Sequence, residues 1–210
     1  MKTVVALLAF TAAAFTAAAG TETTSGAQPA RSQANASGAA RANTELSPRS
    51  IYQLGFNWTN DEGKPLQLSE LQGNAVVLTM FFSNCEYSCP MLISDMKRLR
   101  SALSPEAQAK SRFVLVTFDT DRDTPAALQR YRKRMQLDSG WTLLHGDANA
   151  VQELAMVLGI KYRASADGQF SHSSLITVLD KNGEIAGQRV GMTGDIAELQ
   201  KAVLQSEKGG

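Results

Sequence analysis

The chain reads Val76-Val77-Leu78-Thr79-Met80-Phe81-Phe82-Ser83-Asn84-Cys85-Glu86-Tyr87-Ser88-Cys89-Pro90, and this stretch indicates the architecture more clearly than any other. Its apolar run predicts a strand at residues 75–82 that is buried on both faces. A short loop follows, and then a helix with Pro90 at its first position that runs to about residue 103. Cys85 and Cys89, the only cysteines of the chain, therefore lie where the strand gives way to the helix. A doubly wound α/β sheet binds its ligands outside the carboxyl ends of its strands, so this junction is the candidate functional site.

The remaining elements alternate between strands and helices. The sequence predicts a hairpin turn at residues 61–64, a second buried strand at 113–118, a helix at 125–135, a short strand or loop at 141–144 and a helix at 148–158. A second hairpin at 175–179 and 184–190 turns at Asn182-Gly183, which suits a type I′ turn, and a helix at 195–204 follows. We expect Met80, Met91, Met96 and Met156 to pack in the core. This order predicts an α/β fold that resembles thioredoxin: a mixed central sheet flanked by helices, with an N-terminal β hairpin and an insertion.

The N-terminal part has the composition of an export signal followed by a tether. Residues 1–19 combine a basic start at Lys2, an uncharged apolar stretch and an Ala-rich end, which is typical of a signal peptide, although a retained anchor is the alternative. Residues 20–50 are rich in Ala, Ser, Thr, Gly, Gln and Asn and predict a disordered linker. The folded domain is expected at residues 51–206. We therefore expect an exported protein, periplasmic or otherwise extracytoplasmic, that is tethered to a membrane if the N-terminal segment is retained.

The charge balance excludes one class of partner. Lys and Arg number 21 against 20 Asp and Glu, a formal net charge of +1, and removal of residues 1–19 with Lys2 would bring it to zero. Nothing electrostatic therefore predicts binding to nucleic acid. The basic run at residues 130–134 is interpreted as a solvated helix face, with docking of an acidic partner as the alternative.

The spacing of Cys85 and Cys89 permits three kinds of chemistry. With the second cysteine in the first helical turn and the first in the preceding loop, both sulfurs can converge on one point. The helix N-terminus favours the thiolate, which assists both metal binding and nucleophilic attack. Two thiolates select a soft ion such as Cu(I) or Zn²⁺. A metal site, a redox-active pair and a structural disulfide all remain open, and a disulfide that closes so short a loop would stabilise the fold only weakly.

His172 is a candidate third donor. It lies in the polar segment 168–174, which is predicted to be a loop that enters the strand at residues 175–179. In a thioredoxin-like sheet the loop before this strand comes close to the start of the active-site helix. Two sulfurs and one imidazole nitrogen would suit three-coordinate Cu(I), and would accommodate Cu(II) if a further donor joined.

Three segments together resemble the Sco/SenC family of copper chaperones: Cys85-Glu86-Tyr87-Ser88-Cys89-Pro90, Phe118-Asp119-Thr120-Asp121-Arg122-Asp123-Thr124-Pro125 and Ser171-His172-Ser173. The resemblance covers residues 54–204. It implies a thioredoxin-like fold, copper bound by Cys85, Cys89 and His172, and delivery to the binuclear copper centre of cytochrome c oxidase. The implied partners are the copper-bearing subunit of the oxidase or another copper chaperone, and a thiol reductant. The chain departs from the family's usual pattern in the residue after Cys85, which is commonly proline, and at Ser171, which is often aspartate.

Two further functions compete with the chaperone hypothesis. In an exported thiol-disulfide oxidoreductase that keeps a partner's cysteines reduced, Cys85 and Cys89 would be the redox-active residues and His172 would be dispensable. A peroxidase of the peroxiredoxin type is a weaker option that only the fold favours.

Asp119 is interpreted as a residue that supports the site from outside the ligand set.

Two other groups of polar residues receive simpler interpretations. Asp123 or Thr124 is expected to cap the helix that Pro125 begins. His145 is interpreted as a loop histidine without a role.

Overall fold

The computed structural model describes residues 46–192 and 194–208. The predicted signal at residues 1–19, and the predicted linker as far as residue 45, lie outside the described residues. Ser50 is buried, and its hydroxyl accepts a hydrogen bond from the backbone of Tyr52 at the start of a short 3-10 helix, η1 (Ile51–Gln53). No helix in the described part of the chain is long and apolar enough to cross a membrane.

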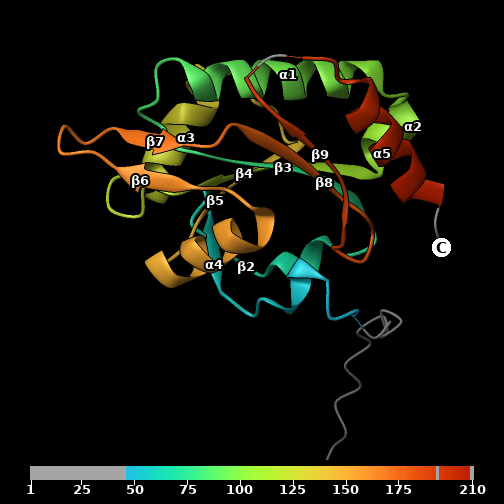
Figure 1. Cartoon of the computed structure of the whole chain (residues 1–210), viewed down its shortest axis with the longest axis horizontal. Coiled ribbons are helices and arrows are strands. Elements are labelled where there is room, and N and C mark those ends of the chain that lie inside the picture. The colour runs from blue at the N-terminus through green and yellow to red at the C-terminus, as the bar shows by residue number, and fades with distance from the viewer. Residues whose placement is uncertain (1–45, 193, 209–210) are drawn as a thin grey trace, which may run out of the picture. The chain divides into compact units, whose positions relative to one another are not determined.

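A seven-stranded mixed sheet forms the centre of the domain (Figure 1). Its spatial order is β2-β1-β5-β4-β3-β8-β9. Strands β3, β4 and β5 are parallel, and the other pairings are antiparallel. The strands are β1 (Trp58–Asn60), β2 (Pro65–Leu66), β3 (Ala75–Phe81), β4 (Ser111–Thr117), β5 (Trp141–His145), β8 (Leu175–Leu179) and β9 (Ile185–Val190). The predicted α/β class and its N-terminal hairpin, β1–β2, are confirmed.

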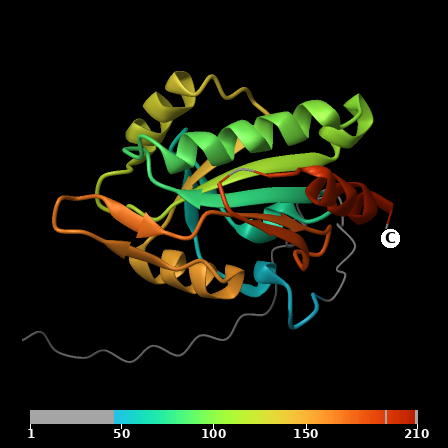
Figure 2. The ribbon, with the colours of Figure 1, turned by 45° about the horizontal axis from the view of Figure 1, so that its top comes forward.

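Helices cover both faces of this sheet (Figures 1 and 2). Helices α1 and α3 lie on one side and α4 on the other. The helical elements are α1 (Ser88–Ala102), α2 (Pro105–Ala109), α3 (Pro125–Arg134), α4 (Ala148–Leu158), α5 (Ala197–Lys208) and the short η2 (Leu68–Leu71). Gly159 ends α4 with a left-handed φ of 76°, a conformation that glycine adopts without steric cost.

The central strands are apolar because they are covered on both faces. All seven residues of β3 are buried, as are six of the seven in β4. These two strands pair in parallel over their full length, from Ala75 opposite Ser111 to Phe81 opposite Thr117. Their carboxyl ends therefore lie side by side, and the loop that carries the cysteines lies next to the loop between β4 and α3.

A second, two-stranded sheet was not expected from the sequence. Strands β6 (Tyr162–Ala164) and β7 (Phe170–His172) form a hairpin that projects beyond the carboxyl ends of β3 and β4 (Figures 1 and 2). The prediction of a loop at residues 168–174 was wrong for the part that forms β7. The strands are only three residues long, and Ser171 and Gly168 interrupt the apolar pattern, so the periodicity was too short to reveal them.

Smaller differences have local causes. Pro90 is the third residue of α1 rather than the first, because the helix begins at Ser88. Asn182 has a negative φ and only Gly183, at 80°, is left-handed, so the β8–β9 turn is not type I′. Residues 105–109 form the short helix α2, with Pro105 at its first position and Ser104 as its cap.

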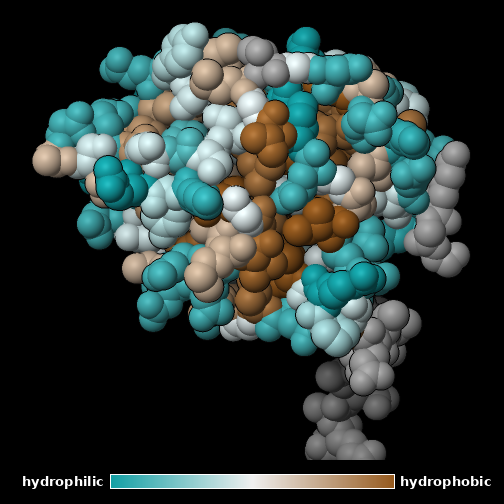
Figure 3. Space-filling model, in the orientation of Figure 1, coloured by the Kyte–Doolittle hydropathy of each residue, from teal (hydrophilic) through white to brown (hydrophobic). Residues whose placement is uncertain are grey.

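Met156 was wrongly assigned to the core. Its side chain is 66% exposed on α4, whereas Met80 and Met96 are buried and Met91 is partly buried. Apolar side chains gather near the middle of the face shown in Figure 3, over the region of β9 and α4, and the exposed apolar residues of these elements include Val190 and Met156.

Leu115 in the middle of β4 is fully buried, and its replacement measures the contribution of the core. We expect Leu115→Ala to lower the free energy of unfolding by about 2–5 kcal/mol, because the change removes apolar contacts and leaves a cavity. Met156→Ala is the matched control and should change it by no more than about 0.5 kcal/mol, since that side chain is largely exposed. Urea denaturation followed by circular dichroism measures both. Equal effects of the two substitutions would contradict this description of the core.

Candidate metal centre

The two cysteines lie on either side of the start of α1. Cys85 belongs to the loop after β3, and Cys89 is the second residue of the helix. Cys89 is completely buried, whereas Cys85 is 8% exposed. The backbone N–H of Cys89 donates to Cys85 Sγ at 3.3 Å, so the first helical turn directs a hydrogen-bond donor at this sulfur. Both thiols are free, which leaves them available for a metal or for oxidation.

His172 completes the cluster from the end of β7. Its Nε2 lies 3.7 Å from Cys89 Sγ, and the three side chains offer donor atoms that all lie within 4.8 Å of one another. On the other side of the ring, Nδ1 lies 3.1 Å from the carbonyl oxygen of Ser173. A carbonyl oxygen only accepts hydrogen bonds, so this contact places the ring proton on Nδ1 and leaves the lone pair of Nε2 facing the sulfurs.

The spacing of these atoms fits a single small ion. Bonds of the length known for zinc, about 2.3 Å to sulfur and about 2.0 Å to nitrogen, place the donors of a trigonal site about 3.5–4 Å apart. The separation of Cys89 Sγ from His172 Nε2 already has this value. Two sulfurs and one imidazole are soft to intermediate donors, which favour Cu(I) or Zn²⁺ over Ca²⁺ or Mg²⁺. Among the described residues, this is the one group of three His, Cys, Asp or Glu side chains that is close enough to hold an ion.

The two thiols differ in their acidity. The pKa of Cys85 lies well below its ordinary value, mainly because the Cys89 thiol donates a hydrogen bond to its sulfur, and also through hydrogen bonds from the Ser88 hydroxyl and the backbone N–H of Cys89. The pKa of Cys89 is raised, first by the same hydrogen bond and then by burial. Of the two thiols, Cys85 at the more exposed position is therefore the more acidic, and Cys89 beneath it is the less acidic.

Ser88 is part of the site, although the sequence reasoning did not include it. Its hydroxyl lies 3.3 Å from Cys85 Sγ and 3.0 Å from His172 Nε2, so it links the loop cysteine to the imidazole. A serine between two cysteines carries no signal of its own. The only available indication was its position in the first helical turn, directly before Cys89.

Aromatic rings surround His172. The Phe118 ring is 5.1 Å from the imidazole, and Phe82 approaches it edge-on at 6.2 Å. Phe170 packs against both of these rings, at 5.0 Å from Phe118 and 5.2 Å from Phe82, and Tyr162 stacks on Phe118. These contacts exclude water from one side of the cluster and fix the orientation of the histidine ring.

The other predicted polar residues do not join the donor set. Asp119 forms an ion pair with Arg122, at 2.6 Å. Thr124, not Asp123, caps α3, because its hydroxyl accepts a hydrogen bond from the backbone N–H of Ala127. The Asp123 carboxylate is buried and binds Ser83 and Thr117 instead.

Two further features lie away from the cluster. His145 is the last residue of β5 rather than a loop residue.

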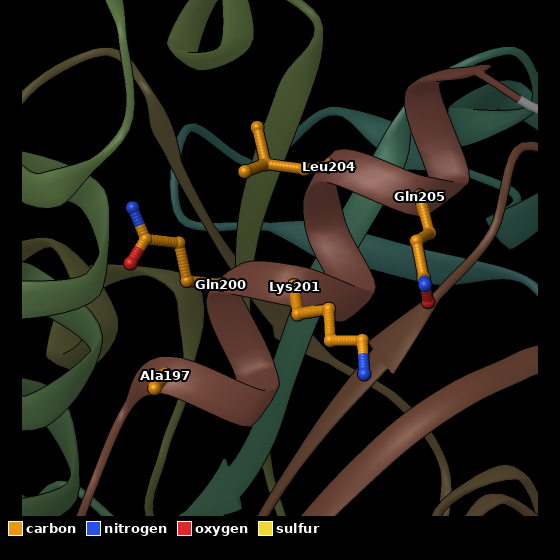
Figure 4. A pocket seen from close by; sticks show the side chains of 5 residues that line it. All are labelled: Ala197, Gln200, Lys201, Leu204 and Gln205. Carbon is orange, nitrogen blue, oxygen red and sulfur yellow. The ribbon is translucent and has the colours of Figure 1, made fainter.

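A shallow hollow lies along α5 and is lined by Ala197, Gln200, Lys201, Leu204 and Gln205 (Figure 4). Helix α5 lies beside α2, at the end of α1 opposite to the cysteines (Figure 1).

The fold and the site define a class of protein: a thioredoxin-like domain with two cysteines and a histidine gathered at the start of its first long helix. The sequence profile of the SCO1/SenC family matches residues 44–206. The chain belongs to this family.

Curated relatives and solved structures agree with this assignment. A Stutzerimonas stutzeri protein named as a copper-binding protein is 31% identical over 153 residues, which span 70% of this chain and 73% of the relative. The SCO1 protein homolog of Bacillus subtilis is 25% identical over 134 residues, 62% of this chain and 69% of the relative. Yeast Sco1, solved with copper bound, superposes with a TM-score of 0.61 at 20% identity, covering 73% of this chain and 86% of that one. The predicted family and thioredoxin-like fold are confirmed.

The acidity of Cys85 predicts a pH-dependent absorbance. A free cysteine has a pKa of about 8.5, so an ordinary thiol is almost fully protonated at pH 6. We expect the reduced chain to keep about one thiolate per molecule at pH 6, seen as absorbance near 240 nm, and to lose it only at more acidic pH. Because the strongest cause is the hydrogen bond from Cys89, Cys89→Ala should move the titration of Cys85 upward, toward the ordinary value. A native chain with no thiolate at pH 6 would contradict the described geometry.

Proposed function

We propose that this protein is a copper metallochaperone that holds one copper ion between Cys85, Cys89 and His172. The observation that carries the proposal is the convergence of two sulfurs and one imidazole nitrogen within 4.8 Å in a largely buried site. Such a donor set is suited to three-coordinate Cu(I) and accepts Cu(II) when a further donor joins. The names of the relatives support copper in particular, since yeast and Arabidopsis family members were solved with copper bound.

We further propose that the copper is delivered to the binuclear copper centre of cytochrome c oxidase during assembly of the enzyme. A solved structural neighbour, BsSco, is described as a member of the Sco family of cytochrome c oxidase assembly proteins, which supports this partner. The proposed acceptor is the copper-bearing subunit of the oxidase or another copper chaperone that exchanges copper with this protein. A thiol reductant would keep the cysteine pair reduced.

The unequal burial of the donors suggests an order of transfer. Cys85 and His172 are the donors that reach the surface, whereas Cys89 is completely enclosed. Thiolates of an acceptor would therefore approach the copper from the side of Cys85 and His172. In this proposal each outer donor is exchanged in turn for a ligand of the acceptor, and Cys89 releases the ion last.

Export fits this role. We propose that residues 1–19 direct the chain out of the cytoplasm, that residues 20–50 act as a tether, and that residues 51–206 form the copper-binding domain. The domain would then work in the periplasm or an equivalent extracytoplasmic space, and it would stay attached to the membrane where the N-terminal segment is retained.

Anaerobic titration with Cu(I) tests the metal site. We expect the reduced chain to bind one equivalent, and we expect Cys85→Ala and Cys89→Ala each to abolish tight binding, because only one thiolate then remains beside the imidazole and Cu(I) prefers thiolate donors. His172→Ala should weaken binding while leaving it measurable, since both sulfurs remain. Competition with a chromophoric Cu(I) chelator measures the affinities. The matched control is His145→Ala, which should bind as the native chain does. Unchanged affinity in the two cysteine variants would refute the proposal.

A thiol-disulfide oxidoreductase is the second candidate. It is favoured by two free cysteines at the start of α1, of which Cys85 accepts the backbone N–H of Cys89 and has the lower pKa, as attack on a disulfide requires. In the reaction, the Cys85 thiolate attacks a partner's disulfide, whose S–S bond breaks; one partner sulfur leaves as a thiolate and the other forms a mixed disulfide with Cys85. Cys89, after losing its proton, displaces the partner's second thiolate, so the partner is reduced and the Cys85–Cys89 pair is oxidised.

His172→Ala separates the two functions. For a copper chaperone, we expect this variant to lose most of its ability to support assembly of active oxidase in cells that lack the native chain. For a thiol reductase, it should support assembly as well as the native chain, because both sulfurs remain. Oxidase activity in membranes is the measurement, and the copper affinity of the same variant shows whether the loss follows the metal.

A further inference from the structure

The loop between β4 and α3 contains a sequence motif, residues 118–125, that the donor set does not use. We propose that Arg122 in this loop is a positioning residue, which holds the β6–β7 hairpin in place and thereby keeps His172 within bonding distance of the two sulfurs. The inference rests on the proposed function, because it assigns a role in building the same site. Arg122 itself does not contact Cys85, Cys89 or His172 by any described hydrogen bond.

The guanidinium of Arg122 connects two segments that are far apart in the sequence. Its Nε donates to Asp119 Oδ2 at 2.6 Å, and the Asp119 side chain is only 4% exposed. A second nitrogen of the same guanidinium donates to the carbonyl oxygen of Gly168, in the turn of the β6–β7 hairpin. The buried carboxylate fixes the arginine, and the arginine in turn fixes the hairpin.

The arginine also packs against the strand that ends in His172. Its Cζ lies 5.7 Å from the centre of the Phe170 ring, within the range of a cation–π contact. Phe170 begins β7 and His172 ends it, so only Ser171 separates the braced residue from the donor. Displacement of Phe170 would therefore move the imidazole.

The hairpin needs such a support because it has little of its own. Its six strand residues pair only with each other and form a sheet separate from the central one. An isolated two-stranded hairpin is at best marginally stable in water. Tyr162, Phe170 and His172 connect its strands to the domain through aromatic rings, and His172 also contacts Ser88 and Cys89. At the turn itself, the described side-chain hydrogen bond to the rest of the domain is that of Arg122 to the Gly168 carbonyl oxygen.

The same loop anchors the cysteines. Asp123, next to Arg122, accepts hydrogen bonds from the backbone N–H and the hydroxyl of Ser83, two residues before Cys85. Arg134 of α3 donates to the Ser83 carbonyl oxygen. Adjacent residues of one loop thus hold the two parts of the donor set: Asp123 supports the sulfur side, and Arg122 supports the imidazole side.

Arg122→Ala tests the proposal, with Arg163→Ala as the matched control. Arg163 lies in β6 of the same hairpin, is exposed, and makes no described side-chain hydrogen bond or ion pair. Its replacement therefore gives the same change of charge and leaves the contacts of Arg122 with Asp119 and Gly168 in place. In the metal-free reduced chain we expect hydrogen exchange of the β6–β7 amides to accelerate in Arg122→Ala, while the amides of β3 and β4 keep their protection. In Arg163→Ala neither should change.

Copper affinity supplies the second readout. Residues that support a metal ligand typically change the affinity by about 10- to 100-fold when they are replaced, and we expect a loss of about this size for Cu(I) in Arg122→Ala. In the His172→Ala background, Arg122→Ala should cause no further loss of Cu(I) affinity, because Arg122 acts on the site only through the histidine. If Arg122 merely stabilised the fold, its loss of affinity would add to that of His172→Ala.

The outcomes separate this inference from the proposed function. A native chain that binds no copper would refute the chaperone, and accelerated exchange confined to the hairpin in Arg122→Ala would still support the brace. In another outcome, the native chain binds copper while Arg122→Ala and Arg163→Ala show the same hydrogen exchange and the same Cu(I) affinity. That result would overturn the positioning role of Arg122 and leave the proposed function standing. If Arg122→Ala lowered the Cu(I) affinity equally in the native and the His172→Ala backgrounds, the positioning role of Arg122 would also be overturned.

Discussion

The parallel pairing of β3 with β4 is the constraint on which the site depends. In this register Phe81 lies opposite Thr117, so the chain leaves both strands at the same edge of the sheet. The exit from β3 becomes the cysteine loop, and the exit from β4 becomes the loop that carries Asp119, Arg122 and Asp123. A shift of either strand by one residue would turn its side chains to the opposite faces and separate these loops. The donors therefore depend on the core strands, although none of the donors lies in them.

The environment of the cluster gives its three donors different properties. A backbone N–H from the first turn of α1 and the neighbouring thiol lower the pKa of Cys85, while the hydrogen bond that Cys89 donates to Cys85, together with burial, raises the pKa of Cys89. The contact of His172 Nδ1 with a carbonyl oxygen leaves Nε2 free for a metal. The two proposed functions use the same pair of sulfurs, and they differ in whether they require the histidine.

Much of this could be predicted from the sequence, for identifiable reasons. The apolar run at residues 75–82 and the strand at 113–118 are long and uniform, and Gly159 marks the end of α4, so these elements were found nearly in place. The β6–β7 hairpin escaped because three-residue strands around Gly168 show no clear period. Met156 was misassigned because helix periodicity does not distinguish a core face from an exposed apolar one.

The sequence by itself determined the α/β class, the location of two thiols at the start of a helix, and the candidate donors Cys85, Cys89 and His172. These features are local, or depend on the kind of residue present. Only the tertiary structure decided that His172 Nε2 lies 3.7 Å from Cys89 Sγ, that Ser88 joins the cluster, and that Asp123 supports Ser83 rather than capping α3. The residues brought together by these contacts are up to 84 positions apart in the chain, and their meeting is set by strand register and packing, which no local pattern encodes.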